Sequence, residues 1–494
     1  MHELKKKAFM GVLWSGGNLI FNQVIALVVK LVLVRLLIPD EFGLAAMAAV
    51  VISSLDLISA FGIGSAFVRD NESDPVKAKN TLFYLHATAH FLIALIGFFI
   101  APYVAVFFGD KISDPAVISS LVLAIRILAL AHLTTMFLGV PSAVLNKNLR
   151  FKEQVIANLL GFLTYGFVAI ILAFLGMGFW AIIIAQAANG VVRRITIFSF
   201  CPFIPSLIFD KKIAKDYINF GKNSFISTIA DIIITNGDDT LIGRLLGAAA
   251  LGFYSIGQHF AGVVATVVAG VITGVAFPVF AKLQSNKEAY QRAFFKIFRL
   301  RALFALPSIG GAMVLGPEIV KLVFGEKWLP VLVPFYILSV AALLNQLVPL
   351  AGPVLNSLNK PHIPRNNRLI QMGVFVVLAY PFTKMWGLAG MSLVMASFSI
   401  VSLIYLSPKM AKVIPGFYSN LFKVLGRIVP ITALMMIIVY FSKKLVYVNL
   451  FWLFSLVFLG VVVYFVPMWI VDKDLKWDVQ EGWSVLKEKF SFLR

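Results

Sequence analysis

The chain has 494 residues, of which 60% are hydrophobic and only 13% charged, and its mean hydropathy is +0.91. So little polar surface excludes a soluble globule of this length and predicts a protein that crosses a membrane many times. The formal net charge of +20 does not indicate a nucleic-acid partner, because the sequence offers no soluble basic domain to bind one. The single cysteine, Cys201, excludes an intramolecular disulfide.

The N-terminal stretch MHELKKKAFMGVLW begins like a signal peptide, but its apolar run continues without a cleavage site, so we expect an uncleaved first span. Further apolar segments are long enough to cross about 30 Å of hydrocarbon. The predicted fold is an all-α polytopic membrane protein of about 14 transmembrane helices. The spans are expected near residues 9–37, 40–68, 80–108, 116–140, 154–176, 178–199, 217–245, 249–280, 294–316, 329–357, 363–383, 386–407, 419–442 and 448–470.

The chain repeats itself at an offset of 209 residues, the separation of Arg35 from Arg244. The same offset relates Gly43 to Gly252 and Gly178 to Gly387, and one inserted residue relates Leu145-Asn146 to Leu355-Asn356. Since each copy holds six spans, both copies enter the membrane in the same direction. We therefore predict an N-lobe at 1–200, a cytoplasmic linker at 201–216, a C-lobe at 217–408, two extra helices at 409–471 and an amphipathic cytoplasmic tail at 472–494.

Lys and Arg are concentrated in alternate connecting segments, beginning with Lys5, Lys6 and Lys7 before the first span. Segments rich in Lys and Arg stay in the cytoplasm. Both termini are therefore expected to be cytoplasmic in a multi-pass protein of the bacterial inner membrane, with the positive charge facing anionic membrane lipids.

The first helix of each copy carries one polar stripe. Ser15, Asn18, Asn22 and Lys30 share a face in the first copy, and the offset carries this stripe to Ser224, Ser227, Asp231 and Asp239, with Thr235 between them. Polar groups in hydrocarbon must face protein or a water-filled cavity. We therefore expect two lobes that turn these stripes toward a central path. The substrate-path candidates are Asn18, Asn22, Lys30, Arg126, Ser227, Asp231 and Thr235.

Charged residues inside the spans give further candidates. Asp56 and Asp231 lie near the middle of their spans, so either could exchange H⁺ or Na⁺, or be a structural carboxylate. Lys30 and Asp239 are equivalent in the two copies and could close the outer side as an ion pair, with Asp238 as the alternative partner. Arg126 suits a phosphate or pyrophosphate group.

Three histidines, His86, His90 and His132, lie in neighbouring spans, but no Cys, Asp or Glu is spaced to complete a metal site, so we expect them to line a cavity or form hydrogen bonds. The sequence has no GxGxxG, Walker, GxSxG or HExxH motif. We therefore expect no catalytic residue, metal or cofactor.

Four stretches resemble the Wzx-type polysaccharide flippases, and in particular the colanic-acid and lipopolysaccharide exporter branch of the multidrug/oligosaccharidyl-lipid/polysaccharide exporter superfamily. They are RLLIPDEFGLAAMA at 35–48, ISSLDLISAFGIGSAFVRD at 52–70, VLNKNLRFK at 144–152 and GMGFWAIIIAQ at 176–186. Ile38 departs from the Gly usual at its position. The resemblance implies two six-helix lobes around a V-shaped cavity. It also implies translocation of an undecaprenyl-diphosphate-linked oligosaccharide to the outer leaflet for surface polysaccharide biosynthesis.

We expect a transporter that works by alternating access, and not an enzyme. The expected partners are the lipid-linked oligosaccharide, membrane lipids, H⁺ or Na⁺, and polysaccharide polymerase or assembly proteins. Two alternatives stay open. A drug/cation antiporter of the same superfamily would share the fold, and a membrane-embedded polysaccharide polymerase or ligase would share the substrate.

Overall fold

The computed structural model describes residues 22–23, 25–59, 62–70, 73–111, 114–262, 280, 283–284, 286–348, 350–447 and 449–471, without the side chains of residues 59 and 222–229. The start of the first expected span, the second half of the span expected at 249–280 and the tail helix expected at 472–494 lie outside these residues. The described part is helical and contains no strand, as predicted. In a bilayer, a helix satisfies its backbone polar groups within one segment.

The first half of the chain begins with a helix at residues 25–36. It continues with α2 (Pro39–Ser59), α3 (Ile63–Arg69), α4 (Pro75–Gly109), α5 (Pro115–Leu133), the 3₁₀ segment Thr134–Phe137, α6 (Gly139–Lys147), α7 (Phe151–Phe174) and α8 (Phe179–Phe200). Residues 39–69 are together long and apolar enough for the span expected at 40–68, and within them α2 and α3 are separate helices. Gly62 precedes α3 with a φ of 66°, a left-handed conformation that glycine adopts without a steric penalty and that interrupts a helix.

The second half begins with α9 (Lys211–Leu246) and a helix at residues 248–262. It continues with α11 (Lys287–Ile319), a π-helical turn (Val320–Phe324), a 3₁₀ segment (Glu326–Val331), α12 (Leu332–Asn345), α13 (Ala351–Ser357), α14 (His362–Val413), α15 (Phe417–Lys444) and α16 (Leu450–Val471). Ten of the described helical segments are long and apolar enough to cross a membrane. The total of fourteen spans stays a prediction.

Backbone conformations recur at the offset of the sequence repeat. Gly178 has φ 56° and ψ −136°, and Gly387 has φ 56° and ψ −133°. Gly178 precedes α8, whereas Gly387 separates the two helices that together make up α14. Leu149 and Asn359, just after α6 and α13, have φ values of 55° and 57°. The N–H of each bonds to a carbonyl three residues earlier, at 3.1 Å in both cases. The two halves therefore repeat in local structure as well as in sequence.

Several helices begin with a side-chain cap at the residue before the first turn. Asp74 and Asp114 each precede a proline at the first helical position, where a missing N–H costs nothing. The backbone N–H groups of Lys77 and Val76 donate to Asp74 and lower the pKa of its carboxyl. These caps fix where the chain turns back into the bilayer.

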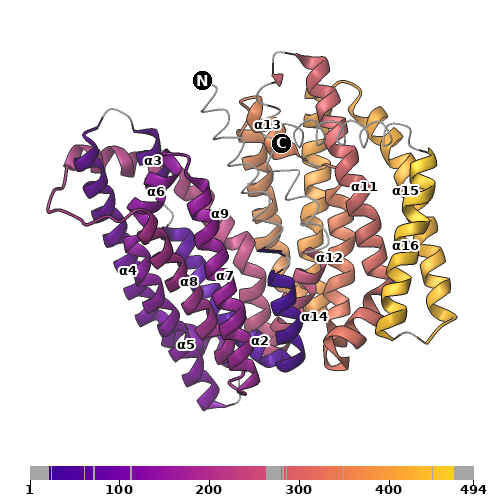
Figure 1. The fold of residues 1–494 in the computed structure, drawn as a ribbon, viewed down its shortest axis with the longest axis horizontal. Coiled ribbons are helices and arrows are strands. Elements are labelled where there is room, and N and C mark those ends of the chain that lie inside the picture. The colour runs from indigo at the N-terminus through magenta and orange to yellow at the C-terminus, as the bar shows by residue number, and fades with distance from the viewer. Residues whose placement is uncertain are drawn as a thin grey trace, which may run out of the picture.

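Figure 1 shows two bundles of helices that lie close together at one end and diverge toward the other. Helices α2 to α8 form one bundle, and α11 to α16 form the other. Helix α9 contacts α2, α3 and α4 of the first bundle as well as α14 of the second. Helices α15 and α16 contact each other and α11, at the edge farthest from the first bundle (Figure 1).

The two bundles meet where α2 and the helix at 248–262 begin. A Cβ atom added to Gly43 would lie 1.8 Å from the carbonyl oxygen of Ala248, and one added to Gly252 would lie 2.0 Å from that of Pro39. Both distances are far below van der Waals contact, so neither crossing has room for a side chain. Since Gly43 and Gly252 are related by the repeat, the junction has two matching crossings.

The substitution Gly43→Ala tests this junction. We expect it to lower the stability of the fold by about 1–3 kcal/mol, because the added methyl group must push two backbones apart. Thermal unfolding of the purified protein in detergent measures the change. The control is Gly373→Ala inside α14, where no heavy atom lies within 4 Å of an added Cβ and alanine favours the helix by about 1 kcal/mol. An unchanged unfolding temperature for Gly43→Ala would contradict the close crossing.

Candidate functional site

The predicted stripe residues lie on the helix at 25–36, just before it, and on α9. Asn18 lies outside the described residues, and of Ser227 only the helical backbone is described. Asn22, Lys30 and Asp231 are partly buried, whereas Thr235 is exposed. Because α9 contacts both bundles, its polar face lies where the halves of the protein meet.

Lys30 and Asp239 form an electrostatic pair between the two halves, consistent with their equivalent positions in the repeat. Both side chains are partly buried. Oδ1 of Asp239 is buried without a hydrogen-bond partner among the described residues. Within that part of the chain, Lys30 is the cation whose charge compensates Asp239.

Asp238, the alternative partner, has a different environment. Its side chain is buried, with 1% of its surface exposed. The hydroxyl of Tyr254 donates to Oδ2 at 2.9 Å, and Nε2 of Gln258 donates to the same oxygen at 3.0 Å. The backbone N–H of Asp239 donates to Oδ1 at 2.9 Å. These bonds tie α9 to the helix at 248–262, so the described partners of Asp238 all belong to the second half.

Asp231 has a cationic partner that the sequence analysis did not identify. Nε of Arg368 on α14 donates to Oδ1 of Asp231 at 3.0 Å, and both side chains are about half exposed. Arg368 looked like one of the Lys and Arg residues that set topology. Helix α14 begins at His362, so Arg368 lies more than one turn inside it. An accessible guanidinium beside a carboxylate presents two chemically different groups to a ligand.

Arg126 on α5 lies against α4. Its guanidinium is 4.7 Å from the ring centre of Phe98, and its Nε donates to the carbonyl oxygen of the same residue at 3.4 Å. Its described contacts are therefore within the first bundle. Lys30 and Asp239 interact with each other, whereas the described contacts of Arg126 include neither of them.

Asp56 on α2 lies beside His132 on α5. Nδ1 of His132 is 2.5 Å from Oδ1 of Asp56, although the two groups are not aligned as a hydrogen bond. The ring of His90 lies 5.0 Å from that of His132, and the ring of His86 lies 5.4 Å from that of His90. From the sequence alone, Asp56 and the histidines are separate candidates. They form one row because α2, α4 and α5 pack against one another.

Two equivalent arginines cross between the bundles at the end where these meet. Arg35 follows Lys30 on the first helix and donates from its guanidinium to the carbonyl oxygen of Leu322, just after α11. Arg244, its equivalent on α9, donates to the carbonyl oxygen of Phe107 near the end of α4 and pairs with Asp110 at 2.6 Å. Each arginine thus holds the end of a helix in the other half.

Trp328 adds further contacts at the end where the two bundles meet. It is fully buried, its indole Nε1 donates to the carbonyl oxygen of Val34 at 2.8 Å, and its ring packs edge-on against Phe42 at 5.3 Å between centroids. Nζ of Lys327 donates to the carbonyl oxygen of Leu37 at 2.8 Å. The last carbonyls of the first helix are therefore satisfied by the other half of the protein.

Comparison with solved structures shows that the fold is that of a multi-pass membrane transporter. The lipid II flippase MurJ, in an inward closed conformation, matches with a TM-score of 0.77 at 14% identity, covering 94% of this chain and 99% of MurJ. An inward-facing multidrug resistance MATE family transporter of the MOP superfamily matches with a TM-score of 0.63 at 14% identity, covering 81% of this chain and 96% of the transporter.

The family described as "Polysaccharide biosynthesis protein" matches residues 32–333, and the chain belongs to this family. The lipopolysaccharide biosynthesis protein WzxC of Escherichia coli (strain K12) is 25% identical over 344 residues, covering 69% of this chain and 68% of WzxC. The teichuronic acid biosynthesis protein TuaB of Bacillus subtilis (strain 168) is 25% identical over 359 residues, covering 72% of each. The succinoglycan biosynthesis transport protein ExoT of Rhizobium meliloti (strain 1021) is 24% identical over 297 residues, covering 60% of this chain and 58% of ExoT. The resemblance seen in the sequence is confirmed.

A double-mutant cycle on Lys30→Gln and Asp239→Asn tests their pairing. Each single change leaves one partly buried charge without its partner, and we expect a loss of about 1–3 kcal/mol in stability. The double variant should lose less than the sum, by about 1 kcal/mol or more. Thermal unfolding in detergent measures all four proteins. Additive losses would show that the two charges do not interact.

Proposed function

We propose that the protein is a flippase that moves an undecaprenyl-diphosphate-linked oligosaccharide from the inner to the outer leaflet for surface polysaccharide biosynthesis. The observation that carries this proposal is membership of a polysaccharide biosynthesis family in a chain with the fold of a lipid II flippase. The names of WzxC and ExoT, a lipopolysaccharide biosynthesis protein and a succinoglycan biosynthesis transport protein, point to the same process. A transporter, not an enzyme, is the role that family and fold support.

We place the protein in the bacterial inner membrane with both termini in the cytoplasm, on the evidence of its Lys and Arg distribution. The end where the bundles meet then faces outward. The proposed lobes are 1–200 and 217–408, joined by the linker 201–216 and followed by the extra helices in 409–471 and the tail at 472–494. In this orientation Lys30, Asp239 and the crossed arginines close the outer side, with Asp238 supporting Asp239.

The polar residues between the lobes suit the head of such a cargo. Asn18, Asn22, Ser227 and Thr235 offer hydrogen-bonding groups for sugar hydroxyls, and Lys30 and Arg126 are the cations proposed for the diphosphate. We add Arg368 as a third cation for the diphosphate, because its guanidinium is accessible. It can release Asp231 and bind a phosphate oxygen instead, and the released carboxylate is exposed enough that no buried charge is left unpaired.

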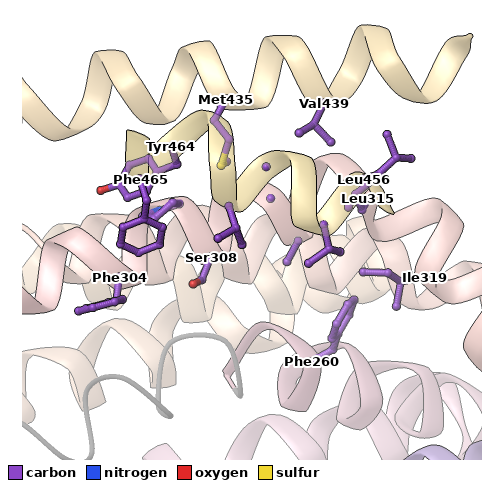
Figure 2. Close-up of a pocket in the computed structure, with 16 residues that line it drawn as sticks. Phe260, Phe304, Ser308, Leu315, Ile319, Met435, Val439, Leu456, Tyr464 and Phe465 are labelled. Carbon is purple, nitrogen blue, oxygen red and sulfur yellow. The ribbon is translucent and has the colours of Figure 1, made fainter. Parts of the chain in front are cut away.

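An apolar cavity in the second bundle suits the other end of the cargo. It has a volume of about 350 Å³ and lies between α11, α15, α16 and Phe260 (Figure 2). Only Ser308 and Tyr464 among its lining residues carry a hydroxyl, and that of Tyr464 donates to the carbonyl oxygen of Leu303 at 2.8 Å. We propose that a segment of the polyprenyl tail occupies this cavity while the sugars cross between the lobes.

The driving force belongs to the proposal as well. We propose coupling to H⁺ or Na⁺ through Asp56 or Asp231, with rocking of the two lobes as near-rigid bodies for alternating access. The membrane potential supplies about 2.3 kcal/mol per charge per 100 mV. A polymerase or assembly protein that consumes the cargo outside would pull transport in the same direction.

Transport of a labelled lipid-linked oligosaccharide in proteoliposomes tests the function directly. We expect the label to move between leaflets without chemical change, so conversion of the sugar would instead establish a polymerase or ligase. Deletion of the gene should deplete surface polysaccharide. Drug sensitivity with intact surface polysaccharide would establish the drug/cation antiporter.

The tail cavity predicts the effect of Ser308→Phe. The added ring fills space beside Leu315 and Met435, so we expect the rate of glycolipid transport to fall about tenfold, a barrier increase of about 1.4 kcal/mol. The control is Ile404→Phe, at a side chain of α14 that is 70% exposed. Equal transport by both variants would contradict a role for the cavity.

A further inference from the structure

Four titratable side chains form a row inside the first bundle, in the order Asp56, His132, His90 and His86. They come from α2, α5 and α4. The successive separations are 2.5 Å between Oδ1 of Asp56 and Nδ1 of His132, then 5.0 Å and 5.4 Å between ring centroids. At these separations, rotation of an imidazole or a single bridging water spans each step between rings.

One end of the row is exposed, its middle is buried, and its other end lines a cavity. The side chain of Asp56 is 57% exposed, and that of His132 beside it is 2% exposed. His90 is also buried, with 4% of its surface exposed. At the far end, His86 and His90 line a cavity of about 470 Å³ beside α3 and α6. The row therefore leads from an exposed carboxylate, through two buried imidazoles, to a separate hollow.

Several ring nitrogens of the three histidines are free to form hydrogen bonds. Both ring nitrogens of His86, Nε2 of His132 and Nδ1 of His90 are buried without a hydrogen-bond partner among the described residues. Buried polar groups are normally satisfied, and each exception needs an explanation. A nitrogen that must first accept a proton and then release it cannot be held permanently in a bond to a fixed partner.

The surrounding backbone makes room for the end of the row. A Cβ added to Gly139 at the start of α6 would lie 2.5 Å from Cγ of His86, and one added to Gly64 on α3 would lie 4.0 Å from its Nε2. The ring thus lies between two glycines, in a space that an alanine at position 139 would close.

We propose that these four side chains, the histidine relay, take up a proton at Asp56 and pass it to the cavity at His86, or carry it in reverse. The carboxylic acid of Asp56 gives its proton to Nδ1 of His132, which releases another from Nε2 toward His90. His90 and His86 repeat this exchange. Each imidazole returns to neutrality as it releases a proton, and no electrons are transferred.

The charges around the relay come from α2 and α8. Asp56 and Arg194 act electrostatically on His90, and Arg193 interacts with Asp56. Arg194 is held by bonds from its guanidinium to the carbonyl oxygen of Ala131 at 2.9 Å and to Oγ1 of Thr134 at 2.8 Å. Its guanidinium therefore lies at a fixed place beside α5. Among the described residues no three ligands are placed to share a metal ion.

The relay deepens the proposed function, because it gives the ion coupling at Asp56 a path, yet its proton movement can be measured without any glycolipid. Full-length protein is placed in phosphatidylethanolamine/phosphatidylglycerol vesicles that trap a pH-sensitive dye. A potassium gradient with valinomycin sets an inside-negative potential. We expect the lumen to acidify faster than in protein-free vesicles.

Substitutions His90→Gln and His132→Gln should each lower the protein-dependent rate at least tenfold, because glutamine keeps the polar volume but cannot exchange a proton. Asp56→Asn, which keeps the size and polarity of the side chain but cannot release a proton, should do the same. The matched control is His259→Gln, since His259 in the second half also has a buried Nε2 without a described partner.

Wild-type vesicles that acidify no faster than empty ones would overturn the relay. So would a wild-type rate in His90→Gln, His132→Gln and Asp56→Asn, or an equal loss in His259→Gln. Transport of labelled glycolipid in the same vesicles separates the two proposals. Proton flux without glycolipid transport would contradict the flippase alone, and glycolipid transport without proton flux would contradict the relay alone.

Discussion

The arrangement of the two bundles depends on the two backbone crossings where α2 and the helix at 248–262 begin. With Gly43 against Ala248 and Gly252 against Pro39, no side chain separates the backbones. The helices that lead into these crossings, residues 25–36 and α9, are thereby brought together in equivalent orientations. This proximity places Lys30 beside Asp239 at the junction and lets arginines one turn further along reach across it.

The crossed arginines set the cost of opening the junction. Separation of the bundles there breaks the bonds from Arg35 to Leu322 and from Arg244 to Phe107 and Asp110. These contacts lie at exposed positions, where a charged pair contributes about 0–1 kcal/mol, so they favour the closed junction only modestly. A ligand shifts such an equilibrium only by its difference in affinity for the two states. Phosphates of the proposed cargo would supply that difference by binding Lys30 in place of Asp239, or Arg368 in place of Asp231.

Sequence periodicity and composition were sufficient to predict the helical class, the repeat and most helix positions, because lipid exposure imposes a long apolar run on every span. The break at Gly62 was missed because a glycine inside an apolar run reads equally well as helix or as a turn. The repeat alone predicted that Lys30 and Asp239 interact, and their role as an ion pair that closes the outer side stays a prediction. Arg368 with Asp231, and His132 with Asp56, could not be paired, since the contacts join spans far apart in sequence and the repeat does not relate their positions.

The repeat also shows where the halves have diverged. At the offset of 209, positions 56, 86, 90 and 132 correspond to Ala265, Phe295, Arg299 and Ala341, so the second half lacks the titratable row. Conversely, half of the lining of the apolar cavity comes from α15 and α16, which lie outside the repeat, and the other half comes from α11 and Phe260. Symmetry is retained at the junction, where the two halves meet, and is lost inside each bundle. An interface built from matched crossings can rock about one axis, while the interiors are free to specialise. The proposed proton path and the proposed tail cavity occupy opposite bundles for this reason.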